Sequence, residues 1–311
     1  MEKYLFNQKL LKEKYNMEID LDLYDYKQRR LILEKWRDVI DNKSIDKLNE
    51  IQLKEIFVSD ILNKVLRYKS LTDNIMDYNI KPEEKTKIDG TRADIVLGYF
   101  SNEESDYRVA IELKKPTTNL DAKQLRKNNH NTPVEQGFSY LPKYGRNCTW
   151  LIVSNFKEIR LYNANDATEY EFFSIKDIYE KDDVFKKFLY LLSSKSLMTK
   201  HGKSRVEVLW EENIKQEEAI EKGFYDLYKN TRLNLFNDIL LNNKDILDVK
   251  TCLTKTQKIL DRVIFVCFAE HKGLIPENIF ETCIQVGKKS VSRFGVWEQV
   301  KGLFESIDLG N

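Results

Sequence analysis

The sequence predicts an α/β fold, with a mixed central sheet flanked by helices, followed by an all-helical domain. Three observations support this expectation. Over the first 75 residues or so, apolar residues recur every three or four positions. Between about residues 85 and 175 they alternate or form short runs, and from about residue 180 the helical spacing returns. These two periods are typical of amphipathic helices and of strands.

We expect two domains, because 311 residues exceed the roughly 100–200 of an ordinary domain. The first covers residues 1–180, of which 1–50 form a helical lead-in, and the second is a helical domain over 181–311. The boundary falls near 178–205, where the stretch SSKSLMTKHGKS is polar and weakly patterned. Only 11 glycines and 5 prolines interrupt the chain, which favours long helices over an all-β fold.

The elements follow in order from these patterns. Before the sheet, a strongly amphipathic helix passes through Leu53, Ile56, Phe57, Ile61, Val65 and Leu66. Strands are expected at 92–99 and 107–114, joined by the polar turn SNEESD, and at 149–154, 158–162 and 169–174. Helices are expected at 120–127 and 134–143 within the sheet region, and at 184–192, 206–240, 253–271 and 296–307 beyond it.

Composition excludes several classes of protein. The net charge is +1, so any nucleic-acid surface must be local. The longest apolar run, Val263–Ala269, is far shorter than the roughly 20 residues that span a membrane, and the N-terminus has no signal-peptide core. We therefore expect a cytoplasmic protein with no membrane partner. The four cysteines and three histidines are scattered, which argues against a zinc site.

Three residues suited to phosphodiester chemistry should meet on the sheet. Asp94 lies near the start of one predicted strand, and Glu112 and Lys114 lie near the end of the next. Side chains of a strand alternate between its faces, so Glu112 and Lys114 share a face, while Val109, Ile111 and Leu113 point to the core. Two adjacent strands can thus bring an aspartate, a glutamate and a lysine together.

This set matches what metal-dependent phosphodiester hydrolysis requires. Magnesium prefers oxygen ligands and is usually held by one or two carboxylates, here Asp94 and Glu112. The backbone carbonyl of Leu113 points into the same region and could be a further ligand. The metal would activate a water and stabilise charge on the phosphate, and Lys114 would orient that water or stabilise the transition state. We expect Mg²⁺ as the cofactor, with Mn²⁺ as a substitute.

An aspartate, a turn and a Glu-x-Lys at the end of the next strand resemble the PD-(D/E)xK nuclease superfamily, introduced here by GTRAD at residues 90–94. The resemblance implies an α+β core like that of restriction endonucleases. Gln136 and Tyr140 resemble the Gln-x-x-x-Tyr motif of many such nucleases, in which the pair contacts DNA or supports the catalytic lysine. Glu55 resembles the acid that an early helix adds to the metal site, and Glu50 competes for that role.

The segment after the Glu-x-Lys strand is locally basic. It carries Lys115, Lys123, Arg126 and Lys127 against a single acid, Asp121. We expect these four basic residues to contact the phosphates of double-stranded DNA. A solvated loop and helix without a ligand is nearly as consistent with the same residues.

The stretches at 224–232 and 260–276 resemble the helical connector of single-chain type IIG restriction–modification enzymes, and the resemblance extends from about residue 30 onward. In those enzymes a methyltransferase and a target-recognition domain follow. No glycine-rich cofactor loop and no Asn-Pro-Pro-Tyr motif occurs here, so S-adenosylmethionine would be used only by a region absent from this chain. A methyltransferase and recognition region in cis or in trans is therefore an expected partner.

These observations predict an Mg²⁺-dependent type II site-specific deoxyribonuclease of a restriction–modification system, acting in phage defence. One such site cuts one strand, so double-strand cleavage suggests a dimer on DNA. Two alternatives stay open. One is the nuclease domain of a type I restriction motor subunit, and the other is a non-cleaving DNA-binding or scaffold module with the nuclease fold.

Overall fold

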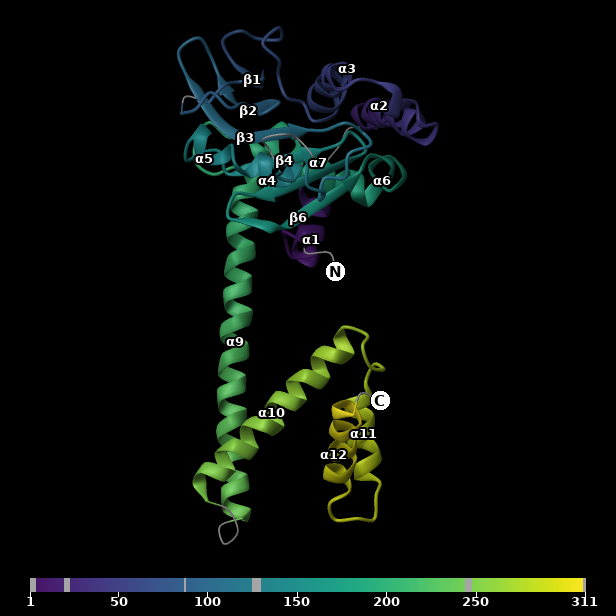
Figure 1. Cartoon of the computed structure of the whole chain (residues 1–311), viewed down its shortest axis with the longest axis vertical. Helices are drawn as coiled ribbons and strands as arrows, with labels where there is room; N and C mark the ends of the chain where they lie inside the picture. The colour runs from purple at the N-terminus through teal and green to yellow at the C-terminus, as the bar shows by residue number, and fades with distance from the viewer. Residues whose placement is uncertain (1–3, 20–22, 87, 125–129, 244–247, 310–311) are drawn as a thin grey trace. The chain divides into compact units, whose positions relative to one another are not determined.

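The computed structural model describes residues 4–19, 23–86, 88–124, 130–243 and 248–309. The chain divides into two compact units, Met1–Gln216 and Glu217–Asn311. The first unit contains a mixed sheet with helices on both faces, and the described residues of the second form helices joined by turns (Figure 1). The predicted fold class, an α/β core followed by a helical domain, is therefore confirmed.

The sheet of the first unit has six strands in the order β1-β2-β3-β4-β5-β6. The strands are β1 (Tyr78–Pro82), β2 (Ile95–Phe100), β3 (Ser105–Leu113), β4 (Trp150–Ser154), β5 (Glu158–Asn163) and β6 (Asp166–Ser174). Neighbouring strands are antiparallel except for the central pair, β3 and β4, which run parallel. Parallel neighbours need a crossover connection, and the described helices between these two strands lie on one face of the sheet.

The helices cover both faces. One face of β3 presents Val109, Ile111 and Leu113 to a large hydrophobic core, to which most helices of the first unit also contribute apolar side chains. These are α1 (Gln8–Glu18), α2 (Leu23–Asp41), the short η1 (Ser44–Lys47), α3 (Glu50–Phe57), the π-helix η2 (Val58–Val65), α6 (Ile175–Glu180), α7 (Asp182–Leu192) and α8 (Ser194–Leu197). The opposite face carries α4 (Pro133–Phe138) and α5 (Leu141–Tyr144), which belong to a smaller core. Glu112 and Lys114 project to this second side.

The domain boundary expected at residues 180–181 is wrong, since the first unit extends to Gln216. Helix α7 buries Phe185 and Phe188 completely in the main core, so it cannot belong to a separate domain. The beginning of α9 (Arg205–Asn242) packs there as well, with the ring of Trp210 6.3 Å from that of Trp150 in β4. The polar stretch that suggested a boundary lies within the first unit, and its Leu197 and Met198 are buried in the main core.

Three element predictions need correction. Leu120–Gln124, the described part of the expected helix at 120–127, is not helical. The helix expected at 134–143 is two short helices, α4 and α5, separated by a turn. Strand β1 had no counterpart in the prediction, because its five residues YNIKP show no clear alternation and end in a proline.

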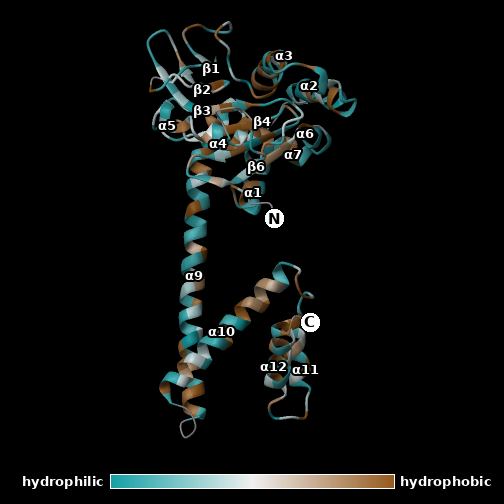
Figure 2. Ribbon diagram, in the orientation of Figure 1, coloured by the Kyte–Doolittle hydropathy of each residue, from teal (hydrophilic) through white to brown (hydrophobic). Residues whose placement is uncertain are grey.

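The second unit contains the rest of α9, α10 (Val249–His271), α11 (Ile279–Lys288) and α12 (Gly295–Asp308). Its core joins Val266 to Val300 and Phe304, and apolar residues recur along α10 and α12 (Figure 2). Gly287 is required where α11 meets α12, because a Cβ there would lie 2.4 Å from the Cα of Val296. Within the described residues of the chain, no helix is long and apolar enough to cross a membrane.

Candidate active site

Asp94 stands immediately before β2 and is held in a fixed orientation. Its Oδ2 atom accepts a hydrogen bond of 2.8 Å from the backbone N–H of Leu113, the last residue of β3. Its own backbone carbonyl accepts from the N–H of Glu83 at 2.9 Å. The strand therefore begins three residues later than the predicted Arg92, and Asp94 occupies the rim of the sheet rather than its interior.

Glu112 and Lys114 lie side by side at the end of β3 and are almost fully buried. The side chains of Glu112 and Lys114 expose only 3% and 6% of their surface, and the Lys114 ammonium donates to Glu112 Oε1. The parallel pairing with β4 holds this end of the strand, because the N–H of Lys114 donates to the carbonyl of Ser154 at 2.9 Å. The sequence periodicity correctly placed both side chains on the face opposite Leu113.

Burial makes the charged form of the Glu112 carboxylate unfavourable, even with Lys114 beside it. Its burial raises its pKa to about 7, an effect that the positive charge of Lys114 opposes and the negative charges of Asp94 and Glu50 reinforce. A buried carboxylate beside a second carboxylate is a typical environment for binding a divalent cation, whose charge compensates both.

Gln136 connects Lys114 to the helix that covers this face. Its side-chain oxygen accepts from Lys114 Nζ at 3.1 Å and from Gln124 Nε2 at 2.9 Å, and its amide nitrogen donates to the hydroxyl of Tyr140 at 2.6 Å. The structure thus places Gln136 against the lysine and Tyr140 against Gln136. Burial and the nearby charge of Glu112 raise the pKa of Tyr140 to about 12, so its phenol stays protonated at neutral pH.

A glycine in α4 allows this contact. A Cβ on Gly137 would lie 2.8 Å from Cδ1 of Leu151 in β4, closer than carbon atoms approach in proteins. The absence of a side chain lets α4 lie directly on the sheet. The adjacent Gln136 can then reach Lys114.

The backbone of Leu113 also faces the site. In a strand, the N–H and C=O of one residue point to the same edge, and the N–H of Leu113 points to Asp94. The pairing of β2 with β3 begins at Ile95, opposite Ile111, so Leu113 lies beyond the paired stretch. Its carbonyl is therefore directed toward the side of Asp94, in the position expected of a third oxygen ligand.

Helix α3 contributes Glu50 and Lys54 to the site, and not Glu55, which was the first choice from the sequence. Glu55 is exposed, and it is not one of the residues that chiefly shift the pKa of Glu112. Glu50, the competing choice, is half-buried and its charge acts on Glu112. Lys54, one turn later, places its ammonium 3.5 Å from Asp94 Oδ1 and 2.8 Å from a carboxylate oxygen of Glu83. The structure thus favours Glu50 over Glu55 and adds Lys54, whose i,i+4 spacing from Glu50 was the available signal.

The loop after β3 is fixed to the sheet. Its only acid, Asp121, forms two bonds of 2.7 and 3.0 Å with the guanidinium of Arg160 in β5. Leu120 beside it is fully buried. Lys115 and Lys123 are exposed on this loop, as a contact with phosphates requires, whereas Arg126 and Lys127 fall outside the described residues.

The donor set suits a hard cation with few protein ligands. Among the described residues, no three His, Cys, Asp or Glu side chains gather as a metal cage. Magnesium does not need such a cage, because it commonly binds one or two carboxylates and fills its other positions with water and substrate oxygens. Asp94 Oδ1, the carboxylate of Glu112 and the carbonyl of Leu113 are the oxygen donors that fit it.

Comparisons with known proteins add little to this geometry. No family model matches the chain, and no curated protein matches it. A cryo-EM structure of a DrdV–DNA complex is similar at 11% sequence identity and a TM-score of 0.32, over 89% of this chain and 26% of the other. The chain thus spans about a quarter of the length of that protein. At this level the likeness carries no argument about function.

Proposed function

We propose that the first unit is an Mg²⁺-dependent DNA endonuclease domain that hydrolyses phosphodiester bonds. The observation that carries this proposal is the buried Glu112–Lys114 pair beside Asp94, with Gln136 on the lysine. A buried pair of opposite charges is an expensive way to stabilise a sheet, since its desolvation cost often exceeds its Coulombic gain. Stability alone does not account for burying this pair next to a second carboxylate, whereas binding of a metal and a phosphate does.

Each side chain has a role that follows from its position. Asp94 and Glu112 would hold the cation together with the carbonyl of Leu113, and Mg²⁺ bound there would supply charge to the phosphate and an activated water. Lys114 would orient the attacking water or stabilise the charge that develops on the phosphate. Gln136 keeps the ammonium of Lys114 in place, and Tyr140 keeps Gln136 in place.

We further propose that the substrate is double-stranded DNA and that the domain serves a restriction–modification system of type IIG. Lys115 and Lys123 are exposed beside the site and would contact the backbone, which binds basic residues independently of sequence. One such site cuts one strand, so cleavage of both strands requires two copies on the DNA. Double-strand product whose yield rises with protein concentration would support a dimer, and nicked product alone would argue against it.

The decisive experiment is plasmid cleavage with Mg²⁺ or Mn²⁺ by the wild type and by three variants of matched purity. Lys114→Ala removes the proposed catalytic lysine. Asp94→Asn removes a metal-binding charge but keeps an oxygen that can accept from the N–H of Leu113. Lys176→Ala is the control, because this lysine of α6 makes exposed ion pairs with Asp41 and Glu180. We expect metal-dependent cleavage by the wild type and the control, and a loss of at least about a hundredfold in the other two.

Each other outcome has a definite meaning. Equal cleavage by all four proteins would identify a contaminant and overturn the site assignment. No cleavage by any of them, combined with metal-independent DNA binding, would favour the scaffold module. Helicase motifs encoded after residue 311 would instead assign the domain to a type I motor subunit, and methyltransferase motifs there would support the type IIG assignment.

A further inference from the structure

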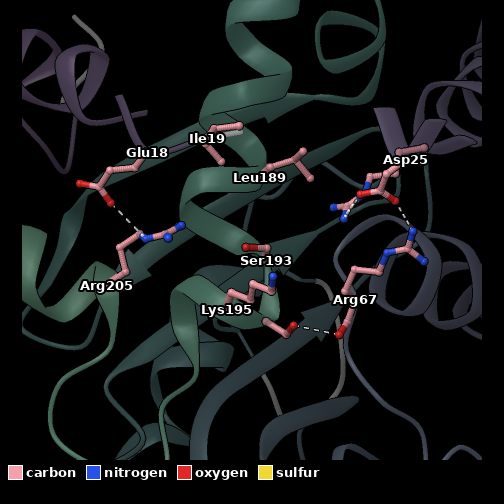
Figure 3. A pocket seen from close by; sticks show the side chains of 10 residues that line it. Glu18, Ile19, Asp25, Arg67, Leu189, Ser193, Lys195 and Arg205 are labelled. Atoms are coloured by element: carbon pink, nitrogen blue, oxygen red, sulfur yellow. Dashed lines mark hydrogen bonds and ion pairs between the residues drawn. The ribbon is translucent and has the colours of Figure 1, made fainter. Parts of the chain in front are cut away.

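A second charged cavity lies in the first unit, away from Asp94 and Glu112. Its volume is about 360 Å³, and it is enclosed by the end of α1, the start of α2, the turn after η2, the α7–α8 junction and the first residue of α9. The lining residues are Glu18, Ile19, Asp25, Arg29, Arg67, Leu189, Ser193, Ser194, Lys195 and Arg205 (Figure 3). None of them belongs to the candidate active site.

The lining carries an excess of positive charge. Four basic side chains face two carboxylates, which leaves a net charge of +2. Arg205 pairs with Glu18 at 3.3 Å. Lys195 is exposed and makes no ion pair among the residues that the structure describes. In Figure 3, Arg205 and Arg67 stand on opposite sides of the cavity, with Lys195 between them.

Asp25 holds the two remaining arginines in place. One of its oxygens lies 2.6 Å from Arg29, and the other pairs with Arg67. Burial alone would raise the pKa of Asp25, but its hydrogen bonds to Arg29 and Arg67 lower that pKa below the usual value. Arg29 is itself 8% exposed, and its Nε has no hydrogen-bond partner within the described part of the chain. A single carboxylate therefore orients two guanidinium groups without neutralising both.

The backbone beside the cavity is unusual. Arg67 has a φ of +65°, a conformation that residues with a side chain rarely adopt. Its carbonyl accepts from the hydroxyl of Ser194 at 2.8 Å, which helps to hold it there. The eight residues before Leu66 form the π-helix η2, a rare geometry that frequently occurs at functional sites. Such strained segments persist where the surrounding structure fixes them, often beside a ligand.

We infer that this cavity is a binding site for a small phosphorylated molecule of mononucleotide size. Its net charge matches a phosphomonoester, which carries about −1.5 to −2 at neutral pH, and arginines suit phosphate because of their planar pairs of donors. Its volume is at the lower end of the roughly 300–1,000 Å³ of small-molecule pockets, and so leaves room for an organic group beside the phosphate. Ile19 and Leu189 offer that group an apolar wall.

The test is calorimetric titration of the full chain with AMP, inorganic phosphate and adenosine. We expect AMP to bind more tightly than either of the other two, because the site combines an anion-binding end with an apolar wall. Bound AMP should also raise the melting temperature, since a ligand that binds only the folded state stabilises it. These readouts do not depend on nuclease activity, so they stand or fall independently of the proposed function.

A matched pair of variants locates the binding. Lys195→Glu reverses a charge at the second residue of α8, and Lys9→Glu makes the same change at the second residue of α1; both lysines are exposed. We expect Lys195→Glu to weaken AMP binding by at least about tenfold and Lys9→Glu to leave it unchanged. No binding of AMP at millimolar concentration would overturn the inference. So would equal affinity in both variants, or adenosine binding as tightly as AMP.

Discussion

Removing one partner of the buried ion pair between α7 and β6 should strongly destabilise the first unit, because it leaves the other charge buried and unpaired. Glu171 is fully buried and pairs with Lys187, whose side chain is 15% exposed. One oxygen of Glu171 accepts from the N–H of Phe6 at 3.1 Å and from the side chain of Gln8 at 2.9 Å. The pair therefore connects the start of α1 to the edge strand of the sheet.

Lys187→Met should destabilise the first unit by about 3–5 kcal/mol at pH 7–8, because it leaves the carboxylate of Glu171 buried without a counter-charge. The control is Lys186→Met, on the same helix. Lys186 makes an exposed pair with Asp182 at 3.2 Å, so its loss should cost less than about 1 kcal/mol. Urea unfolding followed by tryptophan fluorescence measures both, because three of the four tryptophans lie in the first unit.

The pH dependence of the stability loss in Lys187→Met is a second test of the same ion pair. Burial already raises the pKa of Glu171 above its usual value, against the opposing effect of Lys187. An acid with a raised pKa in the folded state costs nothing below its unfolded pKa, and its destabilising effect grows as pH rises from the unfolded pKa to the folded pKa. Without Lys187 that pKa rises further, so the loss in Lys187→Met should shrink toward pH 4–5. Adding Glu171→Gln should restore most of the stability. A loss equal to that of Lys186→Met, or one independent of pH, would refute this reasoning.

Three further predictions concern the candidate active site. Gly137→Ala should destabilise the first unit by about 1–3 kcal/mol, because the added methyl group clashes with Leu151. Gly223→Ala on α9 is the control: its methyl group meets open space and should stabilise the helix by about 0.5–1 kcal/mol. Urea unfolding measures both variants, and equal effects would contradict the close packing of α4. Mg²⁺ should raise the melting temperature of the wild type but not of Asp94→Asn, and a shift of equal size in both would exclude Asp94 as a ligand. Lys54→Met should tighten Mg²⁺ binding by about three- to tenfold in calorimetry, because it removes a cation 3.5 Å from Asp94; weaker binding would show that Lys54 supports the site instead.

The parts of the site that depend on local periodicity could be predicted from the sequence. Alternation along 107–114 placed Glu112 and Lys114 on one face. The short turn between β2 and β3 makes these strands neighbours, and Asp94 immediately precedes β2. The helical spacing of Gln136 and Tyr140 likewise predicted that they would lie together. In each case the sequence separation is small or the connection is a tight hairpin, so few arrangements are available to the chain.

The parts that depend on packing between distant segments could not be predicted. Whether Glu50 or Glu55 approaches the sheet depends on how α3 lies against it, and a rotation of the helix exchanges one for the other. The extent of the first unit depends on α7 and the start of α9, whose apolar residues look the same whether they pack on the sheet or on another helix. Periodicity shows which side of a helix is buried but not what buries it.

The same distinction applies to the two charged sites of the first unit. Asp94, Glu112 and Lys114 lie at the adjoining ends of two neighbouring strands, so a pattern in the sequence can reveal them. The second cavity draws Asp25, Arg67 and Lys195 from three separate parts of the chain, and each alone resembles an ordinary surface charge. Only the fold shows that a single carboxylate orients two arginines there while a nearby lysine has no ion-pair partner among the described residues. A ligand for this cavity is therefore to be sought by its charge and size, because no sequence motif marks the site.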